Sequence, residues 1–218
     1  MNRRHRALSL PLVVSLAGLA CQSSSADKGA STGESITKAA DQIDLGIQQI
    51  DATIAALHAI TDSPGDLTAQ RKAYEKALAS LESTAEDVAE TASAMRERGQ
   101  AYFTQWDQQL ATIQNEDIRE RSAERREKIQ ENFKGLQADY DEAKEAFSPF
   151  LDNLRDIRTA LQADATVSGI DALKPVVKKV DKDASSVTKE LKDLVESFRE
   201  LGVKLSRMGP KPPEPEKK

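Results

Sequence analysis

The sequence predicts an all-α protein, an elongated antiparallel helical bundle or coiled coil of four helices built around a long central helical hairpin. Two observations predict it. Apolar residues recur every three or four positions through most of residues 36–207, which is the spacing of one helix face, and the apolar–polar alternation of strands is absent. Charged residues make up 31% of the chain and aromatic residues only 4%, as is typical of long solvated helices.

Residues 1–20 resemble a secretory signal peptide. Arginine occupies three of the first six positions, and an uncharged, mostly apolar stretch follows. This stretch is too short to span a bilayer, which takes about 20 apolar residues. We therefore expect residues 1–20 to be removed from the mature protein.

Cys21, the only cysteine, follows the expected cleavage site at Gly18, Leu19 and Ala20. These four residues resemble a bacterial lipobox, which implies that the Cys21 sulfur receives a diacylglycerol and anchors the mature chain to a membrane. The leucine stands two positions before the cysteine instead of the usual three. Because Gly18 and Ala20 also suit ordinary signal peptidase, a free thiol at Cys21 is the alternative. Gln22 stands where an aspartate would retain the protein in the inner membrane, so the resemblance implies the outer membrane, facing the periplasm.

Residues 21–35 are small and polar and have no apolar spacing, which predicts a flexible tether. The first helix is expected at about 36–60, because its apolar residues alternate steps of four and three. They are Ile36, Ala40, Ile43, Ile47, Ile50, Ile54 and Leu57. Pro64 and Gly65 then interrupt the helix.

The second helix is expected at about 67–113 and the third at about 117–162. The same spacing runs through both, and its phase is lost between them, which predicts a turn near Asn115. Pro149 falls inside the third helix, where it removes one backbone hydrogen bond and is expected to bend the helix.

A hairpin folded about Asn115 makes a testable prediction about facing residues. The facing pairs are Gly99 with Phe133, Ala92 with Tyr140, Ala85 with Phe147, Met95 with Leu136, and Leu78 with Leu154. Three of these pairs match a small residue with an aromatic one, as close packing between helices requires. Gly99 costs about 1 kcal/mol relative to alanine in a helix interior, and contact with the Phe133 ring supplies a packing reason for it.

The fourth helix is expected at about 169–207, and the proline- and lysine-rich residues 208–218 are expected to be a disordered tail. The connections at residues 61–66 and 163–168 are short, which favours antiparallel neighbours. The bundle should therefore extend over residues 36–207 as one elongated unit.

Composition excludes several function classes. The whole chain has a net charge of −5, and loss of the signal peptide leaves 28 basic against 36 acidic residues, a charge of −8, so we expect no nucleic-acid partner. After removal of the signal peptide, His58 is the only histidine, and the only cysteine would carry a lipid. Too few metal ligands are left, so no metal site and no cofactor is expected. The sequence has no glycine-rich phosphate loop, no HExxH helix and no cysteine available as a nucleophile, so we expect no enzyme.

Aromatic and basic residues gather near the tip of the expected hairpin. They are Tyr102, Phe103, Trp106, Arg119 and Arg121. With the first helix starting near residue 36, the tip could reach the anchoring membrane, where aromatic rings favour the interface. These residues are therefore candidates for membrane or partner contact. The alternative is that Tyr102 and Trp106 belong to the core.

Three stretches carry a resemblance to a known family. They are "WDQQLATIQNEDIRERSAER" at the hairpin, "PFLDNLRDI" from Pro149, and Ile170 with Leu173 at the start of the fourth helix. Over about residues 66–205 the chain resembles the uncharacterised bacterial coiled-coil lipoproteins catalogued as domain of unknown function 2959. The resemblance implies an envelope location and a helical shape, and it leaves the activity open.

These observations lead to one expected function and one alternative. The expected function is a non-enzymatic, lipid-anchored envelope protein that acts as a coiled-coil spacer or interaction scaffold, bound to the membrane through Cys21 and to a protein partner or itself through its helices. The alternative is a periplasmic helical-bundle carrier of a lipid or another hydrophobic ligand. A continuous packed seam would exclude the carrier, and an apolar cavity near Tyr140 or Phe147 would favour it.

Overall fold

The structure, a computed structural model, describes residues 25–62 and 67–206. These residues form four α-helices and no strand, which confirms the expected all-α bundle. The helices are α1 (Ser25–Thr61), α2 (Thr68–Leu110), α3 (Glu116–Ala163) and α4 (Val167–Ser206). The expected signal peptide at 1–20, the expected lipid attachment at Cys21 and the expected tail at 208–218 lie outside the described residues.

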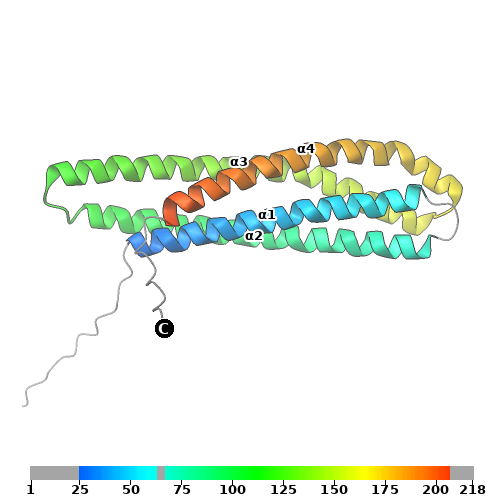
Figure 1. The fold of residues 1–218 in the computed structure, drawn as a ribbon, viewed down its shortest axis with the longest axis horizontal. Helices are drawn as coiled ribbons and strands as arrows, with labels where there is room; N and C mark the ends of the chain where they lie inside the picture. The colour runs from blue at the N-terminus through cyan, green and yellow to red at the C-terminus, as the bar shows by residue number, and fades with distance from the viewer. Residues whose placement is uncertain (1–24, 63–66, 207–218) are drawn as a thin grey trace, which may run out of the picture.

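The helices lie along one long axis and alternate in direction (Figure 1). Each helix packs against two neighbours: α1 and α3 both pack against α2 and α4. The longest helix, α3, has 48 residues, a length of about 72 Å at 1.5 Å per residue. The molecule is therefore a rod only two helices thick.

The turn between α2 and α3 lies at Asn115, as the sequence predicts. The Asn115 side chain accepts a hydrogen bond from the backbone N–H of Ile118 at 3.1 Å and so caps α3. Glu116 and Asp117 follow in the first turn, where negative charge interacts favourably with the helix dipole. Arg119 donates a hydrogen bond to the Ile113 carbonyl at 3.0 Å and ties the turn together.

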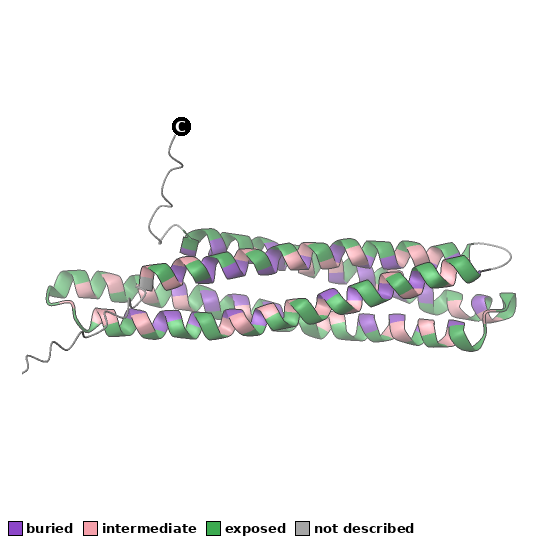
Figure 2. Ribbon diagram, turned by 90° about the horizontal axis from the view of Figure 1, so that it is seen from below, coloured by how far each residue is buried: buried purple, intermediate pink, exposed green. Residues whose placement is uncertain are grey.

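Buried residues form stripes along the inner faces of the helices, with exposed residues outside (Figure 2). They separate into two apolar clusters along the rod. The cluster toward the α2–α3 turn includes Met95 and Phe133. The cluster toward the opposite end includes Phe150 and Leu154, whose carbonyl accepts a 2.8 Å hydrogen bond from the buried Tyr74 hydroxyl. The core therefore consists of two apolar clusters, one after the other along the rod.

The expected pairing of Gly99 with Phe133 is confirmed. A Cβ atom on Gly99 would overlap the Phe133 ring, and no other atoms stand as close to it. Both residues are buried in the cluster near the α2–α3 turn. The glycine therefore makes room for the ring.

The expected tether at residues 21–35 is wrong from Ser25 onward, because α1 begins there instead of near residue 36. The small polar side chains satisfy their hydrogen bonds within the helix. Thr32 donates to the carbonyl of Lys28 at 2.7 Å, and Ser35 donates to the carbonyl of Ser31 at 2.8 Å. Such i to i−4 bonds allow hydroxyl side chains to be buried in a helix, and both residues are buried.

Two glycines in the same stretch allow close helix contacts. A Cβ on Gly29 would meet the Tyr102 ring at 3.0 Å, and one on Gly33 would meet the Gly202 carbonyl oxygen and the Ser206 hydroxyl at 2.7 Å. The start of α1 therefore lies beside the end of α4. The α2–α3 hairpin still projects beyond both, at the left of Figure 1, as the sequence predicts, but by a shorter distance than a helix starting at residue 36 would leave.

Pro149 lies in the second half of α3, and the later, yellow-green part of this helix runs in a different direction from its first part (Figure 1). Proline has no N–H to donate to the carbonyl four residues earlier, and its ring crowds that carbonyl. The sequence prediction of a bend agrees with this view. The bend lies beside the candidate site described next.

Candidate functional site: an apolar groove between α2 and α3

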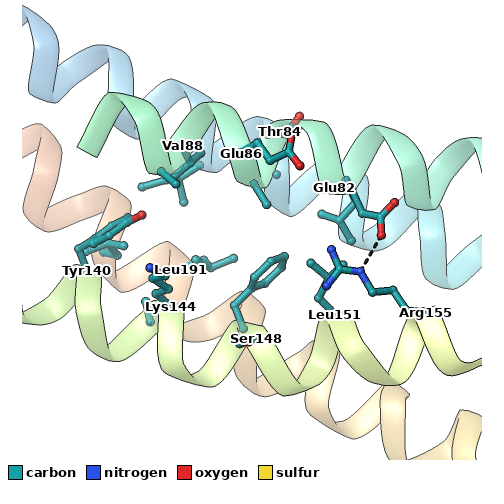
Figure 3. Close-up of a pocket in the computed structure, with 18 residues that line it drawn as sticks. Glu82, Thr84, Glu86, Val88, Tyr140, Lys144, Ser148, Leu151, Arg155 and Leu191 are labelled. Carbon is teal, nitrogen blue, oxygen red and sulfur yellow. Dashed lines mark hydrogen bonds and ion pairs between the residues drawn. The ribbon is translucent and has the colours of Figure 1, made fainter. Parts of the chain in front are cut away.

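An apolar groove of about 280 Å³ lies between α2 and α3, which pack against each other more loosely than the other neighbouring helices do. Figure 3 shows the two helices as the walls of the groove. The walls carry Ala85 and Val88 on α2 and Phe147 and Leu151 on α3. The floor is formed by residues of the other two helices, Ile43, Gly46, Leu191 and Leu194.

The groove lies where the two apolar clusters of the core meet. Leu191 is only partly buried and packs against both clusters, and Val88 and Phe147 are likewise partly buried. The expected pair Ala85 and Phe147 therefore lies at one level of the bundle, and both residues line the groove. Both side chains are only partly buried, because the groove between the helices is open at this level.

Ion pairs join α2 to α3 at both ends of the groove. At one end Glu82 accepts hydrogen bonds from Arg155 at 2.7 Å and from Arg158 at 3.3 Å. At the other end Arg96 pairs with Asp141 at 2.5 Å. On each helix the two bridging positions lie four turns apart, so the two bridges stand about 21 Å apart along the bundle.

The bridge at Glu82 has a defined pH dependence. Partial burial raises the pKa of Glu82, but the hydrogen bonds and charges of Arg155 and Arg158 lower it by more, so that it lies below the ordinary value of 4.5. A carboxylate with a depressed pKa in the folded state stabilises the fold above its unfolded pKa. That stabilisation is lost as the pH falls through the folded pKa.

We expect Glu82→Gln to lower the free energy of unfolding by about 1 kcal/mol near neutral pH, in the range of partly exposed ion pairs. The difference from the unchanged chain should shrink as the pH falls below the ordinary carboxyl pKa and through the depressed pKa of folded Glu82, because the carboxylate is then protonated. Urea unfolding at several pH values measures it. Asp193→Asn is the control, since Asp193 pairs with Lys189 on one exposed helix surface. A Glu82→Gln difference that does not depend on pH would contradict the bridge.

Two charged side chains lie at the lips of the groove. Glu86 comes from α2 and Lys144 from α3, and both are exposed. Neither forms an ion pair or side-chain hydrogen bond with any part of the chain that the structure describes. Figure 3 shows Lys144 and Tyr140 extending from α3 toward the space between the helices. The lips thus present one negative and one positive charge that a ligand can reach.

The aromatic residues expected at the hairpin tip are core residues, so their expected role in membrane or partner contact is wrong. Tyr102, Phe103 and Trp106 are 2%, 5% and 9% exposed. The Phe103 ring packs edge-on against Phe133 at 5.8 Å between centroids, and the Trp106 indole N–H donates to Ser122 at 3.1 Å. The sequence signal for burial is that Tyr102 and Trp106 continue from Gly99 by steps of three and four, the apolar spacing of the helix.

The two arginines expected at the tip differ in their surroundings. Arg119 pairs with Glu116 and donates to the Ile113 carbonyl, so it closes the turn. Arg121 is exposed and has no ion pair within residues 25–62 and 67–206. The acidic residues around them leave the tip without an excess of positive charge. Arg121 alone among the five candidates is an exposed side chain without an ion pair.

His58, the histidine that the sequence analysis examined as a metal ligand, lies beside Asp181 with its Nε2 2.9 Å from the carboxylate. The pair joins α1 to α4 and is partly exposed. Within the described residues, histidine, cysteine and acidic side chains form no group of three that could hold a metal ion. None of the described helices is both long and apolar enough to cross a membrane.

Comparison with known proteins places the chain in a family. The family model described as protein of unknown function DUF2959 matches residues 25–201. The chain belongs to the DUF2959 family. No curated protein and no solved structure matches it. The matched residues begin at the first turn of α1 and include the whole groove, so both the small-residue start of α1 and the groove belong to the DUF2959 region.

Sequence reasoning missed the groove in this DUF2959 chain. Its signal is a level of the bundle to which several helices contribute small side chains: Gly46, Thr84, Ala85, Ala89, Ala143 and Ser148 all line it. Pro149 follows directly in α3. A group of small residues on facing helices indicates incomplete filling of the core, since neither helix supplies the missing volume.

Proposed function

We propose that this protein is a non-enzymatic, lipid-anchored envelope rod that acts as a spacer or interaction scaffold, with Cys21 as the anchor. The observation that carries the proposal is the arrangement of the rod's ends. The start of α1 and the end of α4 lie side by side, as the contact of Gly33 with Gly202 shows, and the end of α1 and the start of α4 lie at the opposite end (Figure 1).

This arrangement suits a tethered spacer. Ser25 follows Cys21 by four residues, a stretch that extends over at most about 14 Å. An anchor at Cys21 would therefore hold one end of the rod at the membrane. The 37 residues of α1 would then carry the opposite end about 55 Å away, where partners of the envelope would meet it.

The anchor is tested by feeding cells an alkyne-bearing fatty acid and replacing Cys21 with serine. We expect the unchanged chain to carry the label and to sediment with membranes, and Cys21→Ser to lose both properties. Ser23→Ala is the matched control, since it leaves the cysteine in place. A labelled or membrane-bound Cys21→Ser chain would refute the anchor.

The scaffold role is tested by photo-crosslinking in cells from two exposed apolar positions. Val167, at the start of α4, is 74% exposed, and Ile118, in the α2–α3 hairpin, is 56% exposed. We expect a crosslinker at Val167 to capture one defined protein, or a second copy of this chain, and a crosslinker at Ile118 not to capture that partner. Capture of the same protein at both positions, or at neither, would contradict a partner at the distal end.

The groove favours a second candidate, a helical-bundle carrier of a lipid or another hydrophobic ligand. An apolar cavity beside Tyr140 and Phe147 is the feature that distinguishes a carrier from a closed rod. Sites for small molecules are concave and mostly apolar, with a few polar groups at defined places. The two candidates are compatible, because a tethered rod can also hold a ligand.

A further inference from the structure

We propose that the groove between α2 and α3 binds the single alkyl chain of a zwitterionic amphiphile, whose head group lies between Glu86 and Lys144. The inference deepens the carrier candidate and rests on the groove alone, so it does not depend on the anchor at Cys21. Its occupant is one lipid chain with a phosphate and an ammonium group, as in a lysophosphatidylethanolamine.

The shape of the groove selects a linear occupant. The residues that line the groove on α3 run from Tyr140 to Arg155, about 22 Å of helix, whereas the volume of the groove is only about 280 Å³. A long space of small volume is narrow. An α-helix, by comparison, has a diameter of about 10–12 Å. An extended alkyl chain fits a long, narrow groove that an α-helix does not.

The lining of the groove matches a hydrocarbon. Val88, Phe147 and Leu191 are apolar and only partly buried, so a bound chain would remove more of their surface from water. Each methylene that is buried contributes about 0.8 kcal/mol. Because the surrounding helices are held by the core clusters on either side, the groove need not form anew when the chain enters.

The charges at the groove select the head group. Four charged residues line it, and two of them, Glu82 and Arg155, are bonded to each other. The remaining two, Glu86 and Lys144, have opposite signs and come from opposite walls. A head group with one negative and one positive charge complements both lips, whereas a fatty acid or an alkylamine leaves one lip beside a charge of its own sign.

The test is calorimetric titration of the full chain carrying Cys21→Ser, which removes the expected lipid attachment, with the protein purified without detergent. The probe is lauroyl-lysophosphatidylethanolamine, below the concentration at which it forms micelles. Laurate and dodecylamine, which share its chain length but carry one charge, are the comparison ligands. We expect saturable binding of one molecule per chain, with the zwitterion bound about threefold or more tighter than either comparison ligand.

Variants separate the groove from other surfaces. Ser148→Leu and Ala89→Leu place a larger side chain in the groove from exposed positions, and each should weaken binding at least about tenfold. Lys144→Ala and Glu86→Ala should each weaken binding of the zwitterion about two- to fivefold. Ala123→Leu, an exposed α3 position outside the groove, is the matched control and should bind normally. Thermal melting followed by circular dichroism shows that each variant is folded.

Four results would overturn the proposal. They are no binding of the zwitterion, equal or tighter binding of laurate or dodecylamine, unchanged affinity in the folded Ser148→Leu and Ala89→Leu variants, and a dimer of the unliganded chain that Ser148→Leu dissociates. The last result would assign the groove to a second copy. A chain that binds the lipid but shows no lipid label on Cys21 in cells would refute the anchor and leave the groove assignment intact.

Discussion

Phe150→Ala is expected to lower the free energy of unfolding by about 3–5 kcal/mol, the range for removing a buried phenylalanine ring. Phe150 is 1% exposed and lies in the apolar cluster farther from the α2–α3 turn. Alanine would leave a cavity there, because the backbones of four packed helices cannot close over the lost volume. Urea unfolding followed by far-ultraviolet circular dichroism measures the change.

Phe147→Ala is the matched comparison, one helical turn before Phe150 on the same helix. The two rings lie 6.0 Å apart between centroids, but Phe147 is only partly buried at the edge of the groove. We expect Phe147→Ala to cost less than half as much as Phe150→Ala, since water already reaches part of its ring. Equal losses would show that the seam is closed at this level and would argue against the groove.

Gly99→Leu is expected to destabilise the bundle by about 1–3 kcal/mol, the range for overpacking a filled core. Even a Cβ at this position would overlap the Phe133 ring, which is itself buried in the core. The α2–α3 contact near the turn must therefore open. Thermal melting of the variant tests this, and an unchanged melting curve would refute the register of the hairpin.

Gly135→Ala is the control for Gly99, because it is also a glycine inside a long helix. A Cβ on Gly135 meets no atom within 4 Å, so alanine should stabilise the chain by about 0.4–1 kcal/mol through backbone entropy and helix propensity.

In the Gly99→Ala background, Phe133→Leu should cost less than it costs alone, since the smaller side chain relieves the overlap. Additive effects would contradict direct contact.

Periodicity predicted most of the fold because apolar spacing is what buries a helix face. The expected bounds of the second, third and fourth helices agree with α2, α3 and α4 to within three residues at each end. The turn at Asn115 was visible as a loss of phase, and the residue itself is an effective helix cap. These features depend on local spacing and cap chemistry, which the sequence displays directly.

The start of α1 escaped prediction because its buried positions are not apolar. Counting back from Ile36 by three and four reaches Gly33 and Gly29, which continue the spacing of the helix with glycine in place of a hydrophobic residue. Glycine here serves close approach to Gly202 and Tyr102, and such contacts depend on a partner helix far along the chain. A composition of small polar residues cannot by itself distinguish this packing from a tether.

The groove escaped prediction for a different reason. Spacing identifies which residues face inward, and the pairing of Ala85 with Phe147 placed both at the correct level. It does not give the separation of two helices, which depends on helix direction and on the volume that all four helices supply at that level. The bend near Pro149 and the small residues around it act together there, and only the assembled bundle reveals their sum.

The division of the core into two clusters has a consequence for local unfolding. Regions joined by few buried contacts open as separate cooperative units, which amide hydrogen exchange resolves. Amides flanking Met95 and Phe133 should therefore exchange together at one opening free energy, and amides flanking Phe150 and Leu154 together at another. Within the helix interiors, the backbone between the two clusters should exchange fastest, so that the middle of the rod opens before either cluster does.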